Sequence, residues 1–221
     1  MNDSLVDVVG TEDMGPMLCL SNVALQVGER WIVQRCTLTV PAGLSLVLGG
    51  DGAGKTSLLR LLAGELSPDA GQLSLAGAAW GSAGWGQQVF WRDPRAPWPA
   101  ALTPRAWTAA LAGQQPRWRE DEWRRHVDGF ALAPHLDKDM HQLSTGSQRK
   151  VLLAAALASG AALTLIDEPV AALDRGAVRY LCAALQRLAD ASPWTERIVL
   201  VAHYDPLDDS LPWRHMLTLA G

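Results

Sequence analysis

The chain has 221 residues, of which 48% are hydrophobic, and its 19 basic and 23 acidic side chains give a net charge of −4. This length can bury a substantial core as one domain, and the acidic balance argues against the basic face that nucleic-acid binding requires. The three cysteines are an odd count at unrelated spacings, which favours free thiols in a reducing compartment over a disulfide framework.

The N-terminal segment is acidic and contains no lysine or arginine. A secretory signal needs a basic start and an apolar middle, and this segment has neither. We therefore expect a flexible arm over residues 1–16 and one domain over residues 17–221. The longest weakly polar stretch, Val151 to Ile166, is shorter than the ~20 residues that span a bilayer, so we expect a soluble chain.

Three strands and a helix are predicted next. Alternating apolar and polar residues indicate strands at Leu18–Val27 and Cys36–Val40, separated by a Gly-Glu turn. A short apolar strand over Leu44–Leu48 ends at a glycine-rich loop. A helix with an apolar face follows from about Lys55 to Ala63.

The loop between that strand and the helix matches the phosphate-loop pattern G-x-x-x-x-G-K-[ST] without a mismatch. Its glycines allow successive backbone N–H groups to point inward and form a nest for phosphate oxygens. Lys55 supplies a positive charge for the β- and γ-phosphates, and the Thr56 hydroxyl is a ligand for Mg²⁺. The dipole of the following helix points at the same phosphates. The predicted nucleotide-binding residues are Gly49, Gly50, Asp51, Gly52, Ala53, Gly54, Lys55, Thr56 and Ser57.

The middle of the chain is predicted to be mostly helical. A short strand over Gln72–Leu75 precedes residues 76–104, which form a long, functional loop rich in Gly, Trp and Pro. Helical patterns then cover Arg105–Ala112, Trp118–Leu132 and Ser147–Ala158. We expect these helices to form a helical subdomain, about residues 94–159, inserted into the domain.

The last part of the chain alternates strands with a helix. The expected elements are a strand over Ala162–Ile166, a helix over Arg175–Ala191, a strand over Arg197–Ala202 and a terminal strand over Met216–Leu219. Such alternation predicts an α/β fold with a mostly parallel sheet covered by helices. The two N-terminal strands would form a separate antiparallel part.

Two acidic residues, Asp167 and Glu168, follow the apolar strand over 162–166. A buried strand would fix them rigidly beside the phosphate loop, where Asp167 can hold Mg²⁺ through water. Glu168 is then placed to accept a proton from the water that attacks the γ-phosphate. The two acids therefore predict the second half of an ATP-hydrolysing site.

Three further motifs resemble those of the ATP-binding-cassette (ABC) ATPases. Residues 143–150 (LSTGSQRK) resemble the family's signature sequence, and residues 167–174 (DEPVAALD) resemble its Walker B and D-loop run. His203 stands where the family places its switch histidine. With the phosphate loop, the resemblance covers about Leu18 to Leu219. It implies a P-loop NTPase core with a helical subdomain.

The resemblance also implies roles for individual residues. Lys55 and Glu168 would be catalytic, with His203 positioning the nucleophile. Ser144 and Gly146 lie at a predicted helix N-terminus, an anion site that would cover the γ-phosphate held by a second chain. Asp174 would communicate across that dimer, so its role belongs to the same interface.

The function that the resemblance implies is that of the ATP-hydrolysing subunit of an ABC transporter, with ATP and Mg²⁺ as cofactors. Its partners would be a second cassette, as a homodimer or a heterodimer, and an integral membrane permease. The chain would then be peripheral on the cytoplasmic face of the cell membrane. No nucleic acid is expected as a partner.

Several positions depart from the family pattern. The signature has Thr145 and Ser147 where the family usually has Gly and Gln. The Q-loop glutamine falls on Arg92, with Gln88 as an alternative, and an arginine cannot ligate Mg²⁺ because it has no acceptor atom. The aromatic residue that stacks on adenine is also displaced, and Trp31 is the candidate.

Seven of the ten tryptophans lie between Trp80 and Trp123. In the family, this region receives the coupling helices of the membrane partner. Because Trp and Arg are enriched at interface hot spots, we expect interface candidates in this stretch, with about half of its tryptophans in the core. The candidates are Trp91, Arg92, Arg95 and Trp98.

Other functions remain open at this point. One is an ABC ATPase without a permease, and another is a small-molecule P-loop kinase, which would not need residues 143–150. The altered Q-loop also allows a binding-only regulatory module. The short length and divergent Q-loop resemble the haem-export cassette of cytochrome c maturation.

Overall fold

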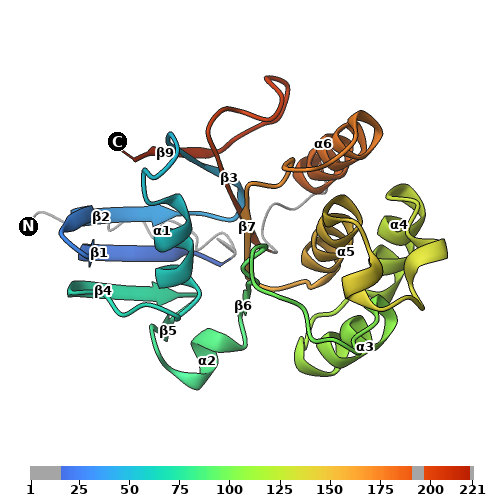
Figure 1. The fold of residues 1–221 in the computed structure, drawn as a ribbon. Coiled ribbons are helices and arrows are strands. Elements are labelled where there is room, and N and C mark those ends of the chain that lie inside the picture. Colours follow the sequence, from blue (N-terminus) through green and yellow to red (C-terminus); the bar gives the residue numbers. More distant parts are fainter. Residues whose placement is uncertain (1–15, 191–196, 220–221) are drawn as a thin grey trace, which may run out of the picture.

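The computed structural model describes residues 16–190 and 197–219, and these form two sheets with helices on both faces of the larger one (Figure 1). The predicted N-terminal arm lies outside the described residues, apart from Pro16. The α/β fold class is confirmed: one sheet is parallel and the other is antiparallel.

The antiparallel sheet has four strands in the order β2-β1-β4-β5. Their bounds are β1 Leu18–Val27, β2 Arg30–Val40, β4 Ala70–Leu75 and β5 Ala78–Ala79. Strand β2 begins six residues earlier than the alternation pattern predicts. The reason is a bulge: the register shifts between the pairs Val23–Cys36 and Leu25–Val33, and Arg35 has a φ of 48°.

The parallel sheet has five strands in the order β6-β7-β8-β3-β9. Their bounds are β3 Gly43–Leu48, β6 Val89–Phe90, β7 Leu163–Asp167, β8 Ile198–His203 and β9 His215–Thr218. Every residue of β7 and β8 is buried, as expected for strands covered on both faces. In the register, Leu48 pairs with His203 and Asp167 pairs with Ala202. The three strand ends that lead into the predicted site residues therefore lie side by side.

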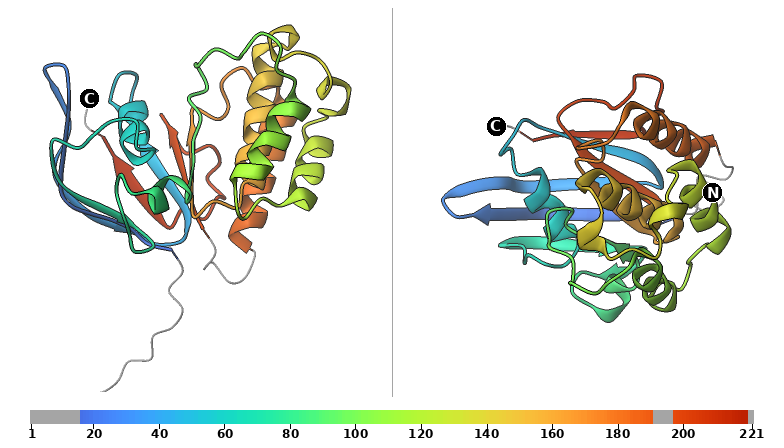
Figure 2. Two further views of the ribbon diagram at one scale, coloured as in Figure 1. Left: turned by 90° about the horizontal axis from the view of Figure 1, so that it is seen from below. Right: turned by 45° about the vertical axis from the view of Figure 1, so that its right-hand side comes forward.

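The helices form layers on both faces of the parallel sheet (Figure 2). Helix α1 (Lys55–Leu62) and the antiparallel sheet lie on one face, and α5 (Thr145–Ala158) and α6 (Arg175–Asp190) on the other. Helices α3 (Pro104–Gln114) and α4 (Glu120–Gly129) pack outside α5 (Figure 1). The shorter elements are α2 Ala83–Gly86, η1 Ala133–His135 and η2 Met140–Gln142.

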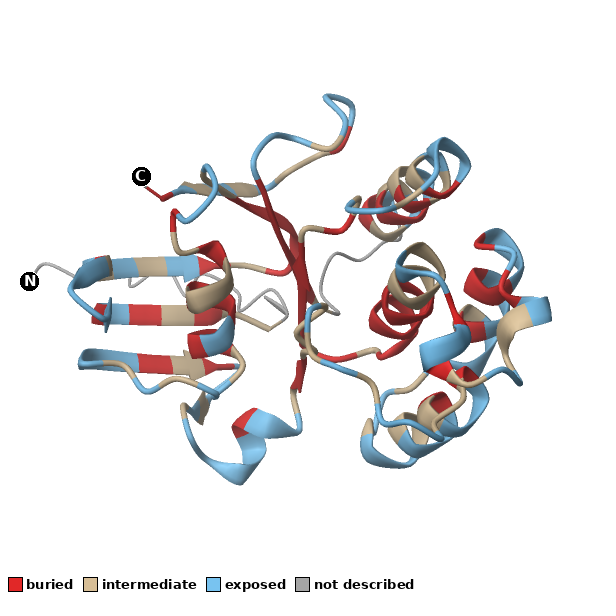
Figure 3. Ribbon diagram, viewed as in Figure 1, coloured by how far each residue is buried: buried red, intermediate tan, exposed pale blue. Residues whose placement is uncertain are grey.

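Two apolar cores flank the parallel sheet, so the red of buried residues is concentrated there in Figure 3. Along β8, Val199 and Val201 pack with α5 and α6, whereas Ile198 and Leu200 pack with α1 and the antiparallel sheet. This alternation follows from the two-residue period of a strand. In the described ranges, no helix combines the length and the apolar character needed to span a bilayer.

The predicted helix over 118–132 is shorter at both ends. Helix α4 begins at Glu120, with three acidic residues in its first turn, which is favourable next to the positive end of the helix dipole. It ends at Gly129 because Ala131 has a left-handed φ of 53°.

Candidate functional site

The glycine loop over residues 49–54 connects β3 to α1, and its backbone favours glycine at two positions. Gly52 and Gly54 have φ values of +72° and +97°. A Cβ on Gly54 would also lie 2.7 Å from the Ile32 side chain. The strand, loop and helix unit that the sequence predicts is therefore present.

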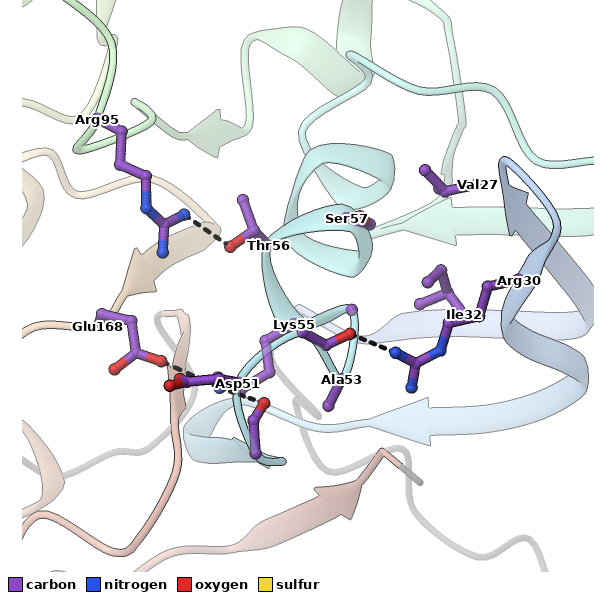
Figure 4. Close-up of a pocket in the computed structure, with 13 residues that line it drawn as sticks. Val27, Arg30, Ile32, Asp51, Ala53, Lys55, Thr56, Ser57, Arg95 and Glu168 are labelled. Atoms are coloured by element: carbon purple, nitrogen blue, oxygen red, sulfur yellow. Dashed lines mark hydrogen bonds and ion pairs between the residues drawn. The ribbon is translucent and has the colours of Figure 1, made fainter. Parts of the chain in front are cut away.

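A pocket of about 390 Å³ opens over this loop (Figure 4). Its floor is the loop and the start of α1, residues 50–57. Val27, Arg30 and Ile32 from the β1–β2 hairpin line one side, and Arg95 and Glu168 lie on the opposite side (Figure 4). The predicted phosphate-loop residues Gly50 to Ser57 all line it, and Gly49 lies just below, at the end of β3.

Lys55 is only 6% exposed and has a partner for each of its three donors. Its Nζ donates to the Gly49 carbonyl at 2.7 Å and to the Gly50 carbonyl at 3.1 Å. It also forms an ion pair with Glu168 Oε1 at 3.0 Å. The ammonium group therefore links the two parts of the site that the sequence predicts separately.

Asp167 and Thr56 also meet, although 111 positions separate them. The Thr56 hydroxyl donates to Asp167 Oδ2 at 2.7 Å, and burial raises the pKa of the Asp167 carboxyl. Asp167 Oδ1 is buried without a hydrogen-bond partner in the described parts of the chain, which is unusual for a buried polar atom. Carboxylate and hydroxyl oxygens are the ligands that Mg²⁺ prefers, so this pair fits the predicted metal.

Glu168 has a backbone conformation that is rare for a residue with a side chain, with a φ of 44°. The Glu168 N–H donates to the Ala202 carbonyl at 2.9 Å, which fixes this conformation against β8. Its Oε2 lies 3.6 Å from His203 Nε2, and His203 Nδ1 lies 2.8 Å from Asp205 Oδ1. The Glu168 carboxylate therefore lies between Lys55 and His203.

Arg95 is a site residue that the sequence analysis missed, since it was considered only as an interface candidate. Its Nη1 donates to Thr56 Oγ1 at 3.0 Å (Figure 4). The same nitrogen lies 3.3 Å from Asp167 Oδ2. No motif contains this residue. The available signal was its position in the loop that follows β6, the strand beside β7.

Arg92, Gln88 and Trp31 do not line the pocket in this structure. Arg92 donates to the carbonyls of Ala96 and Pro97, and Gln88 donates to the Gly84 carbonyl. Trp31 is 44% exposed and lies on the opposite face of β2 from its two pocket-lining neighbours.

The signature residues form a helix N-terminus outside this pocket. Ser144 caps α5, with its Oγ accepting from the Ser147 N–H at 3.1 Å. A Cβ on Gly146 would lie 2.5 Å from the Ala172 carbonyl oxygen, so the helix start packs closely on residues 167–174. Asp174 pairs with Lys150 at 2.6 Å, a contact that lowers the pKa of Asp174 to about 2.

Comparisons with known proteins agree with this geometry. A family model described as "ABC transporter" matches residues 33–171, more than half of the chain. The taurine import ATP-binding protein TauB of Pseudomonas entomophila is 38% identical over 135 residues, 61% of this chain and 52% of that protein. The cytochrome c biogenesis ATP-binding export protein CcmA of Pseudomonas syringae pv. syringae is 34% identical over 196 residues, 86% and 89% of the two chains.

A solved structure of the ATP-binding subunit of an ABC transporter shares the fold, with a TM-score of 0.73 and 21% identity over 85% of this chain and 79% of that one. The chain spans about half the length of TauB and most of the length of CcmA. The matched segment contains the phosphate loop, residues 143–150, Asp167 and Glu168. The resemblance on which the sequence analysis relied is therefore confirmed, and the chain belongs to the ABC transporter family.

Proposed function

We propose that the chain is the ATP-binding and ATP-hydrolysing subunit of an ABC transporter and that it powers a separate membrane permease from the cytoplasmic face. One observation carries the proposal: Lys55, Thr56 and Glu168 line one pocket, and Asp167 is hydrogen-bonded to Thr56 beside it. The names of the relatives, which include both import and export ATP-binding proteins, support the transport role.

In this proposal, the triphosphate lies on the glycine loop. Backbone N–H groups and the α1 dipole stabilise its negative charge, and Lys55 exchanges its present partners for phosphate oxygens. Thr56 and Asp167 would hold Mg²⁺, which neutralises charge on the β- and γ-phosphates when it is bound. The fit rests on the Asp167 carboxylate: its Oδ2 accepts from the Thr56 hydroxyl, and its buried Oδ1 has no hydrogen-bond partner among the described residues.

Hydrolysis is assigned to the acid and the histidine at the ends of β7 and β8. The Glu168 carboxylate accepts a proton from water as the water oxygen attacks the γ-phosphorus and the bond to the β-phosphate oxygen breaks. His203, held on its Nδ1 side by Asp205, presents Nε2 toward Glu168 and positions the water. Glu168 can reach this role only after it leaves Lys55, so triphosphate binding and activation of the base are coupled.

The adenine would lie against the hairpin side of the pocket, where Val27 and Ile32 offer apolar surface. Trp31 can take part only if β2 adjusts, because it faces away in this structure. The signature residues Ser144 and Gly146 would act on the nucleotide of a second chain. Their position outside the pocket of their own chain is consistent with that arrangement.

The experiment compares Glu168→Gln with the wild-type chain. We expect ATP hydrolysis without any acceptor in the wild type and a loss of roughly 100-fold or more in the variant, because amide nitrogen cannot accept the proton. ATP-induced dimerisation, followed by size-exclusion chromatography with light scattering, should be retained. Glu120→Gln, on the exposed surface of α4, is the matched control.

The alternatives give different results in the same experiment. A small-molecule kinase would hydrolyse ATP appreciably only when its acceptor is added. A binding-only module would show no turnover to lose. Co-purification of the wild-type chain with an integral membrane protein from solubilised membranes tests whether a permease is its partner. If the chain is absent from those membranes, the proposed role in transport is wrong.

A further inference from the structure

Arg95 places a positive charge directly on the pair of residues to which Mg²⁺ binding is assigned. Its guanidinium contacts Thr56 Oγ1 at 3.0 Å and Asp167 Oδ2 at 3.3 Å. The Asp167 side chain is fully buried, whereas that of Arg95 is 61% exposed. The arginine therefore reaches from a solvent-exposed loop into the polar end of the pocket (Figure 4).

The loop that carries Arg95 is held in place by several contacts. Asp93 Oδ1 accepts a hydrogen bond from the Arg95 N–H at 2.8 Å, and the Ala96 N–H donates to the Asp93 carbonyl at 3.1 Å. Arg92 donates to two carbonyls at the end of the loop and stacks 3.7 Å from the centre of the Trp98 ring. These contacts define a tight turn with the Arg95 side chain directed toward Thr56.

The same loop is attached to the helical subdomain. The rings of Trp98 and Trp107 meet edge to face with their centroids 4.9 Å apart, and Trp107 belongs to α3. An edge-to-face contact between aromatic rings stabilises a structure by more than the burial of its apolar surface alone would. The position of Arg95 is therefore linked through one turn to the packing of α3.

In the nucleotide-free chain, the contact between Arg95 and Asp167 compensates the charge of a buried carboxylate. Burial of the carboxylate is costly without a compensating positive charge. Lys55 is directed at Glu168, and Arg149 donates to the Asp167 backbone carbonyl, not to its carboxylate. The guanidinium of Arg95 supplies compensation at the carboxylate itself.

Arg95 and Mg²⁺ cannot use these oxygens together. Mg²⁺ held by the Thr56 hydroxyl and, through water, by Asp167 would use the lone pairs that now face Nη1, and its charge would repel the guanidinium. We propose that Arg95 is a displaceable cation, which occupies the place beside Thr56 and Asp167 until Mg²⁺ with ATP expels it. Arg95 thereby sets the Mg²⁺ concentration that tight nucleotide binding requires.

This inference rests on the proposed function, because it assumes that ATP and Mg²⁺ bind in this pocket. It adds a residue that none of the sequence motifs contains. Departure of Arg95 also releases the turn over residues 93–98 from the site. Binding of Mg²⁺ would therefore change the packing of Trp98 against α3.

The test measures ATP affinity by equilibrium dialysis at a series of Mg²⁺ concentrations. In Arg95→Ala, we expect half-maximal tightening of ATP binding at a Mg²⁺ concentration roughly fivefold to tenfold lower than in the wild type. Arg95→Lys, which keeps the charge on a compact group, should lie between them. Arg124→Ala, an exposed arginine paired with Glu120 on α4, is the matched control and should match the wild type.

A measurement with excess EDTA separates this effect from general electrostatics. Without Mg²⁺, loss of a positive charge near the triphosphate should leave ATP affinity unchanged or weaken it. Tighter binding of ATP by Arg95→Ala in Mg²⁺ therefore has the opposite sign and identifies competition. An unchanged or higher Mg²⁺ requirement in both Arg95 variants, with wild-type ATP binding intact, would overturn the inference. A wild-type chain that binds no ATP at any Mg²⁺ concentration would instead overturn the proposed function.

Discussion

His126 makes the stability of the fold depend on pH. It lies in α4, is 2% exposed, and its Nδ1 is 2.9 Å from the Tyr180 hydroxyl of α6. That hydroxyl donates to the Arg125 carbonyl, so its oxygen can accept from Nδ1–H of a neutral imidazole. Burial, with the positive charges of Arg187, Arg197 and Arg125, lowers the pKa of His126 from 6.5 to about 4.

The sign of the effect follows from which state binds more protons. Between pH 6.5 and about pH 4 the unfolded chain protonates this histidine and the folded chain does not. The stabilising contribution is therefore complete above pH 6.5 and is lost as the pH falls through this range. At pH 5, relative to pH 8, these two pKa values lower the free energy of unfolding by about 2 kcal/mol.

Urea unfolding at pH 8 and pH 5, followed by tryptophan fluorescence, measures this difference, since Trp123 lies one turn away in α4. His126→Gln removes the titrating group and should show a fall in stability between the two pH values that is smaller by about 2 kcal/mol. Other groups titrate equally in both chains and cancel in the comparison. If the free energy of unfolding falls equally in the two chains between pH 8 and pH 5, His126 is not the source of the pH dependence. A His126 imidazole that titrates above pH 6 by NMR would contradict the lowered pKa in the same way.

Two further substitutions test contacts elsewhere in the fold. Trp85→Phe removes the buried indole N–H that donates to the Leu62 carbonyl at 3.0 Å, and should lower the free energy of unfolding by about 1–2 kcal/mol in urea; an unchanged midpoint would contradict this. Gly146→Ala should leave ATP binding to the isolated chain intact but weaken ATP-induced dimerisation, because its Cβ would displace the Ala172 carbonyl. Full dimerisation of that variant in light scattering would show that the close packing of the signature helix is not needed.

Much of the fold is encoded in local patterns, which explains why it could be predicted. The phosphate loop needs positive φ at glycines and a buried lysine, and both follow from eight consecutive residues. The positions of Asp167, the last residue of β7, and of Glu168, which follows it, are predictable because a fully buried strand fixes its own end.

The contributions of Arg95 and Trp31 depend on features that the sequence pattern does not contain. Arg95 reaches Thr56 because a turn and the Trp98–Trp107 contact determine the path of its loop. Trp31 faces away from the pocket because strand neighbours point to opposite faces, so an error of one position reverses the assignment. Both outcomes are decided by tertiary packing.

The decisive measurement for nucleotide binding at this pocket compares the ATP affinity of the wild-type chain and of Lys55→Ala, with Lys138→Ala as the control for loss of a lysine. The Lys55 ammonium is the charge placed between the glycine loop and Glu168. We expect ATP affinity to fall roughly 10- to 100-fold in Lys55→Ala and to stay unchanged in Lys138→Ala. Equal affinity of the wild-type chain and Lys55→Ala would contradict this expectation.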